Sequence, residues 1–104
     1  MRFEVYADTS DKYRWRLWSG SNKVAASGES FASKYNAERA AEGFKASAKT
    51  AKYTIFGSGS AWYWNAKALN GEKIASGGES FVSEYSAQRA ADNVRDNAGG
   101  ASGL

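Results

Sequence analysis

Hydrophobic and polar positions alternate along residues 13–18, which is the pattern of a strand with one buried face. One face of that strand carries Tyr13, Trp15 and Leu17, and the other carries Arg14, Arg16 and Trp18. Residues 3–6 are apolar and aromatic, and residues 23–27 form a weaker run, so both are also predicted to be strands. The Ser-Gly-Ser-Asn segment at 19–22 predicts a hairpin turn between the second and third strands.

A helical period replaces the alternation after Ser33. Apolar residues fall at i, i+3, i+4, i+7 and i+11, namely Ala37, Ala40, Ala41, Phe44 and Ala48. This spacing predicts an amphipathic helix, and the Ser33 hydroxyl can cap it by accepting from a free backbone N–H. Because alanine is small, such a helix can lie close to a sheet, with Phe44 as its anchor.

The whole pattern occurs twice. Ten of the fourteen residues at 28–41 are identical to those at 78–91, and Trp15 aligns with Trp64. The second helical face carries Ala87, Ala90, Ala91, Val94 and Ala98. We therefore expect one α+β domain over 1–104, made of two tandem β-β-β-α repeats (1–51 and 52–98) and a flexible tail (99–104). One repeat alone could not bury both its sheet face and its helix. The two repeats could do so if they joined into one antiparallel sheet with both helices on one face.

Three segments resemble the YegP-like family of small bacterial and archaeal proteins. They are Tyr-Arg-Trp-Arg-Leu at 13–17, Lys-Ala-Leu-Asn-Gly-Glu-Lys-Ile-Ala at 67–75, and a helix ending Val-Arg-Asp-Asn-Ala at 94–98. The resemblance implies three strands and a helix per copy, merged into one sheet, with single-copy members dimerising by exchange of a terminal strand. It implies no established activity. The chain has Ala-Ala at 40–41 and 90–91 where the family has Gly-Ile, and Gly and Ser replace the family's last strand.

Composition removes several classes of protein. With 42% hydrophobic residues, four Trp, six Tyr and five Phe, the chain is not a disordered one. It has no Cys and no His, so it lacks the commonest metal ligands and the usual general base. We therefore expect no enzyme activity, no metal and no cofactor. No apolar run is long enough for a membrane helix or a signal peptide, so a cytoplasmic protein is expected.

Three other segments have both a chemical and a structural interpretation, and the structural one is favoured in each. Asp8, Ser10 and Asp11 could bind a hard cation, but they lack the rest of a calcium loop and indicate a solvated turn. The Gly-Ser-Gly-Ser segment at 57–60 precedes a strand-like segment, so it predicts a hairpin turn instead of a phosphate loop. Glu29 and Glu79 could do acid–base chemistry, but equivalent surroundings would not separate their pKa values. Helix capping, or pairing with Arg39 and Arg89, is expected instead.

The first candidate binding surface is the outward side of the central strands. It joins Arg14, Arg16 and Trp18 to Tyr63, Asn65 and Lys67. The net charge of +3 comes entirely from residues 1–51, and aromatic rings between basic residues can stack nucleic-acid bases. The alternative, which we favour, is that the rings pack on cross-strand neighbours and are covered by Arg and Lys stems.

The second candidate surface is the repeated Gly-Glu-Ser-Phe segment with its nearby tyrosines: Glu29, Tyr35, Glu79 and Tyr85. Near-identical sequence in both copies is consistent with two equivalent small sites. It is also consistent with a strand-to-helix joint that needs Gly to turn, Phe for the core and Ser for the cap. The joint explains every residue except the glutamate and is favoured.

Three functional classes stay open. The leading hypothesis is a small non-catalytic interaction module, monomeric or weakly dimeric, whose free sheet edge accepts a strand from a protein or peptide partner. The alternative is a weak nucleic-acid binder that uses the basic and aromatic sheet face, whose binding would fall steeply with salt. A carbohydrate binder comes third, favoured only by the Trp and Tyr content. The partner is not identified by the sequence.

Overall fold

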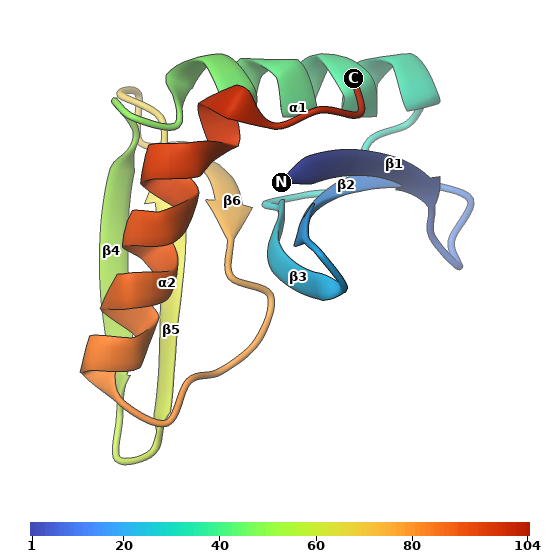
Figure 1. Cartoon of the computed structure of the whole chain (residues 1–104). Coiled ribbons are helices and arrows are strands. Elements are labelled where there is room, and N and C mark those ends of the chain that lie inside the picture. The colour runs from blue at the N-terminus through green and yellow to red at the C-terminus, as the bar shows by residue number, and fades with distance from the viewer.

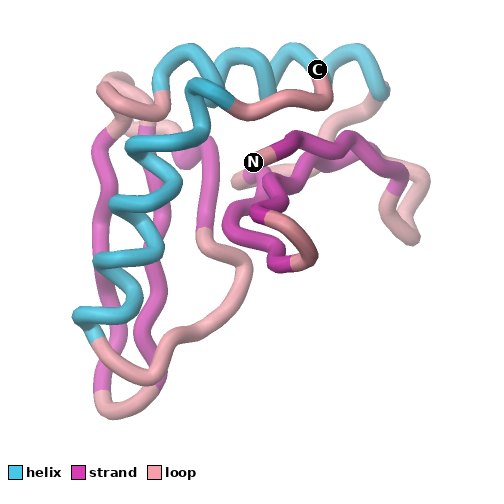
Figure 2. Tube along the Cα trace, in the orientation of Figure 1, coloured by secondary structure: helices cyan, strands magenta, loops and turns pink.

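The computed structural model describes all residues 1–104. Its first half contains three strands and a helix: β1 (Arg2–Ala7), β2 (Tyr13–Ser19), β3 (Asn22–Ser27) and α1 (Lys34–Ser47). Its second half contains β4 (Lys52–Ser58), β5 (Ala61–Lys67), β6 (Lys73–Ser76) and α2 (Glu84–Asn97), followed by a 3-10 turn, Ala98–Gly100. The loops 28–33 and 77–83 lead from the third strand of each half into its helix (Figure 2).

All six strands form one antiparallel sheet in the order β1-β2-β3-β6-β5-β4. The two halves meet at its centre, where Ala26 pairs with Ser76 and Ser27 with Ala75. Small residues at this joint allow the close approach of β3 and β6. The α+β class, with a single antiparallel sheet and two helices, is confirmed (Figure 1).

Both helices contribute to one core on the same face of the sheet. α1 packs on β1 and β2, and α2 packs on β4 and β5 (Figure 1). Trp15 is 1% exposed and stacks on Phe44 of α1, with ring centroids 5.2 Å apart. The largest fully buried side chains are Trp15, Trp64, Phe44, Leu17 and Val94. The prediction that Trp15 and Leu17 face the core, and Arg14, Arg16 and Trp18 face outward, is therefore correct.

Serine caps begin both helices as the sequence indicates. The Ser33 hydroxyl accepts from the backbone N–H of Asn36, and that of Ser83 accepts from Ser86, each at 3.1 Å. Each bond satisfies one of the N–H groups that the first helical turn leaves free. The two caps fix where each loop becomes a helix and so where the residues of loops 28–33 and 77–83 lie.

The two edges of the sheet differ. At the β1 edge, Ser102 donates its N–H to the Met1 carbonyl (3.0 Å) and accepts from the Phe3 N–H (2.8 Å). Ala101 beside it is only 2% exposed. The structure differs here from the flexible tail expected over 99–104, because Ala101 adds to the core and Ser102 satisfies backbone groups of β1. No strand or segment pairs with β4 on its outer side.

Neither helix has the length and apolar character that crossing a membrane requires.

Candidate binding sites

On the outer face of β1 and β2, the first candidate surface is a packed cluster. The Arg16 guanidinium lies 4.0 Å from the ring centre of Tyr6 and 5.2 Å from that of Trp18. Glu4, directly opposite Arg16 in the sheet, accepts from Arg16 Nε (2.5 Å) and from the indole N–H of Trp18 (3.0 Å). The ring faces of this cluster are therefore already in contact with a protein cation.

Carboxylates neutralise part of the positive charge of this face. Arg16, followed by Trp18, lowers the pKa of Glu4 by hydrogen bonding to its carboxylate. Asp8 accepts from the backbone N–H of Ser10 and from Arg14 Nε, and the Ser10 bond is the main reason that its pKa is lowered. Both arginines of the candidate surface thus have a carboxylate partner, which favours the cross-strand packing interpretation over an open cationic face.

The other half of the same face carries an aromatic pair. Tyr63 stacks on Phe56 of β4, with centroids 5.6 Å apart and planes at 21°. Both rings stay accessible, since Phe56 is 45% and Tyr63 40% exposed. Asn65 pairs with Ser76, and Lys67 is exposed at the end of β5. The central strands β3 and β6 separate these residues from Arg14, Arg16 and Trp18, so the structure places the six on one face without bringing them together.

The structure divides the second candidate set into two parts. Tyr35 and Tyr85 are 64% and 69% exposed on the first helical turns. Each hydroxyl accepts a long bond, 3.4 Å, from the arginine four residues later, Arg39 or Arg89. Neither role expected for Glu29 and Glu79 is seen, because serines cap both helices and neither glutamate joins an ion pair. Helical spacing directs each arginine to its tyrosine instead.

Glu29 and Glu79 instead border two pockets that correspond to each other. The first, which we call the α1 pocket, is about 300 Å³ and lies between the loop 28–33, α1 and the β5–β6 hairpin. The second, the α2 pocket, is about 400 Å³ and lies between the loop 77–83, α2 and the β2–β3 hairpin. Each pocket is built from both halves of the chain. The tyrosines line neither.

Sequence reasoning missed three residues at these sites: Phe56, Gly43 and Glu72. Phe56 has a weak signal. It aligns with Tyr6 of the first half, and both are aromatic residues in segments with the composition of a strand. Gly43 is a glycine inside a helical pattern, which normally has a packing or functional reason. Glu72 follows Asn70 and Gly71 in the sequence and gives no signal, because it reaches the α1 pocket only through the pairing of β3 with β6.

The sequence comparisons point to a family of uncharacterised proteins. A domain of unknown function, DUF1508, matches residues 58–102. The UPF0339 protein NMB1088 of Neisseria meningitidis serogroup B is 40% identical over 42 residues, which cover 40% of this chain and 75% of that relative. The chain belongs to the UPF0339 family. The protein NMA1193/NMA1859 of serogroup A matches this UPF0339 chain to the same extent.

Solved structures of UPF0339 and YegP proteins share the fold. The solution structure of UPF0339 protein SO3888 from Shewanella oneidensis has a TM-score of 0.79 and 19% identity, covering 94% of this chain and 84% of that one. The protein yegP from E. coli has a TM-score of 0.77 and 21% identity, covering 97% and 88%. Together with the sequence relatives, these structures confirm the resemblance to the YegP-like family. The names of these proteins state no activity.

Proposed function

We propose that this UPF0339 chain is a non-catalytic interaction module that accepts an extended segment of a partner protein as a seventh strand beside β4. The observation that carries the proposal is the open edge of β4, a seven-residue strand paired only with β5. Backbone N–H and C=O groups along such an edge are free to bond with an added strand. The β1 edge is less open, because Ser102 pairs with its first residues.

The aromatic pair of Phe56 and Tyr63 gives this edge a means of selecting side chains. Side chains of an added strand would alternate between the two faces of the sheet, and those on the outer face would lie beside Phe56. An exposed stacked pair next to unpaired backbone is suited to an apolar or aromatic residue of the partner. Backbone bonds would supply affinity, and the ring pair would supply selectivity.

A nucleic-acid ligand is the second candidate, favoured by the gathering of Arg2, Arg14 and Arg16 on one outer face with Trp18. The ion pairs of Arg14 with Asp8 and of Arg16 with Glu4 reduce the charge available for phosphates. Phosphate binding would weaken steeply with salt, whereas strand addition would change little.

We also propose that the two halves are tandem copies of one β-β-β-α unit within a single domain, with the boundary at residues 51 and 52, in a cytoplasmic protein. The Neisseria relative supports this, because 42 residues make up 75% of it and its length is therefore about 56 residues. That is about one half of this chain. The matching order of strands and helix in each half is consistent with it.

The test is to select short peptides from a random display library against the immobilised protein and to titrate them into the ¹⁵N-labelled chain. Strand addition predicts the largest amide shifts over residues 52–58, with affinity that changes little between low and moderate salt. Phe56→Ser should weaken binding by roughly tenfold, the equivalent of about 1.4 kcal/mol.

Tyr6→Ser is the matched control, since Tyr6 holds the position in β1 that Phe56 holds in β4, and it should leave peptide binding unchanged. Shifts that lie on β1 and β2, with labelled oligonucleotides binding in a salt-dependent way, would instead support the nucleic-acid candidate. Peptides whose shifts avoid β4 would rule the strand-addition proposal out.

A further inference from the structure

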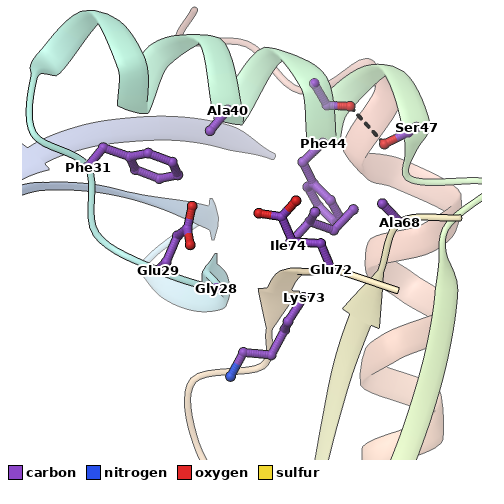
Figure 3. A pocket seen from close by; sticks show the side chains of 11 residues that line it. Gly28, Glu29, Phe31, Ala40, Phe44, Ser47, Ala68, Glu72, Lys73 and Ile74 are labelled. Atoms are coloured by element: carbon purple, nitrogen blue, oxygen red, sulfur yellow. Dashed lines mark hydrogen bonds between the residues drawn. The ribbon is translucent and has the colours of Figure 1, made fainter. Parts of the chain in front are cut away.

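The α1 pocket combines an apolar wall with two carboxylates. Phe31, Phe44 and Ile74 supply apolar surface, and Glu29 and Glu72 supply the carboxylates (Figure 3). Loop 28–33 brings Glu29 and Phe31, α1 brings Phe44, and the β5–β6 hairpin of the other half brings Glu72 and Ile74. The pocket lies on the helix-covered side of the sheet and shares no residue with the β4 edge.

Neither carboxylate has a partner within the protein. The backbone carbonyl of Glu29 and the backbone N–H of Glu72 form hydrogen bonds, but the side-chain oxygens of both residues form none and join no ion pair. Figure 3 shows both carboxylates directed into the space below α1, whereas the Lys73 ammonium points away from it. Both residues are exposed to solvent, and two unpaired negative charges beside an apolar wall attract a cation.

Gly43 leaves the upper wall of the pocket open. A glycine inside a helix costs free energy relative to alanine, so it is normally kept where a side chain would collide. Here a Cβ at Gly43 would meet nothing within 4 Å. Packing therefore does not require this glycine, and its effect is to leave room in the α1 pocket.

The α2 pocket provides a natural contrast. Asn93 stands where α1 has Gly43, and Asn22 stands where the α1 pocket has Glu72. The α2 pocket thus has one carboxylate, that of Glu79, and an additional side chain on its helix wall. Of the two pockets, only the α1 pocket combines two carboxylates with an open helix wall.

We propose that the α1 pocket binds a small free organic cation, a primary ammonium carried on a short apolar body. The ammonium group would form charge-assisted hydrogen bonds with Glu29 and Glu72, which are stronger than bonds between neutral groups. The apolar body would pack on Phe31, Phe44 and Ile74. A volume of about 300 Å³ suits one aromatic or branched aliphatic amine.

The probe for the test is phenethylammonium chloride, followed by ¹H–¹⁵N NMR of the labelled chain. Shifts at the amides of Gly43 and Ile74, with a dissociation constant on the order of millimolar, are expected for so small a ligand. Neutral 2-phenylethanol has the same apolar body and should bind about tenfold more weakly, because it lacks the charge. Equal binding of the alcohol would overturn the proposal, as would shifts confined to the α2 pocket.

Variants locate the site. Glu29→Gln and Glu72→Gln should each weaken binding about tenfold, and Gly43→Leu should abolish it by filling the pocket while the thermal midpoint is retained. The matched controls in the α2 pocket, Glu79→Gln and Asn93→Leu, should bind as the unaltered chain does. Undiminished binding by both glutamine variants would overturn the proposal whatever happens to Gly43→Leu.

A lysine side chain of a protein is the other source of an ammonium on an apolar stem. N-acetyl-lysine N-methylamide separates the two sources, because it carries the same ammonium on an unbranched aliphatic stem, which has no ring to pack on Phe31 and Phe44. It should bind more weakly than phenethylammonium. Tighter binding of the lysine derivative would overturn the assignment to a free amine.

Discussion

Trp15 lies between Phe3 and Phe44, edge-on to the first ring and stacked on the second. It is among the largest buried side chains of a core that otherwise consists mainly of alanine. The flanking alanines are too small to move into the space that a lost indole would leave. The free energy of unfolding is therefore concentrated in a few aromatic residues.

Trp15→Ala should lower the free energy of unfolding by about 3–5 kcal/mol, from lost burial and the cavity left behind. Urea denaturation followed by circular dichroism measures the change. Leu69→Ala is the control, since Leu69 is exposed in the β5–β6 turn and should change stability by less than about 0.5 kcal/mol. A Trp15→Ala midpoint equal to that of the control would contradict this account of the core.

Tyr53 holds the position in β4 that Phe3 holds in β1, and its hydroxyl donates to the Ala48 carbonyl at 2.8 Å. Burial raises the pKa of Tyr53 from 10.0 to about 12. Between those values the unfolded chain loses this proton while the folded chain keeps it. The contribution of Tyr53 to stability is therefore full below pH 10 and is lost as the pH rises toward 12.

Tyr53→Phe should remove that alkaline loss, so the stability difference between the two proteins should shrink as the pH rises from 10 to 12. At neutral pH the variant should be about 1 kcal/mol less stable, since the hydrogen bond to Ala48 is missing. Urea midpoints of both proteins across this range test the prediction. A constant difference would mean that Tyr53 titrates as an exposed tyrosine does.

At the scale of elements, the strands, both helices and their serine caps follow from local sequence. Alternation in β2 and the alanine face of α1 each specify an element and its buried side without reference to the rest of the chain. The α1 pocket and the position of Ser102 do not follow locally. They depend on contacts between segments far apart in sequence, which a residue pattern does not record.

Replacing either of two glycines near the α1 pocket with alanine should change the free energy of unfolding, but in opposite directions. A Cβ at Gly28 would lie 2.6 Å from the backbone oxygen of Lys73, so Gly28→Ala must separate the loop from β6 and should cost about 1–3 kcal/mol. Gly43→Ala meets no atom and favours the helix, so it should add about 0.5–1 kcal/mol. Thermal unfolding of both variants measures the two changes in stability. A destabilised Gly43→Ala would show that this glycine serves packing.

For the whole molecule, the N- and C-terminal segments lie side by side, since Ser102 bonds to both Met1 and Phe3 (Figure 1). A short flexible linker from Leu104 to Met1, with new ends between the exposed residues Lys49 and Thr50, should therefore give a folded circular permutant. Closing the linker costs chain entropy, so a loss of about 1–2 kcal/mol is expected.

NMR spectra and urea denaturation of the permutant provide the measurement. A second permutant opened between Tyr63 and Trp64 interrupts a strand paired on both sides and should not fold. Failure of the first permutant, with soluble but unfolded protein, would show that the order of the two halves along the chain is essential.

On the proposal that the two halves are tandem copies of one unit, the sharing of each pocket between them has an evolutionary consequence. In a symmetric dimer of half-length chains, every substitution appears in both pockets at once. A substitution that improves binding in one pocket therefore alters the other pocket as well. A chain that carries both halves is free of that restriction. Gly43 and Glu72 beside one helix, and Asn93 and Asn22 beside the other, are the kind of divergence that such freedom permits. One pocket can acquire substitutions that suit a ligand while the residues of the other pocket continue to serve packing.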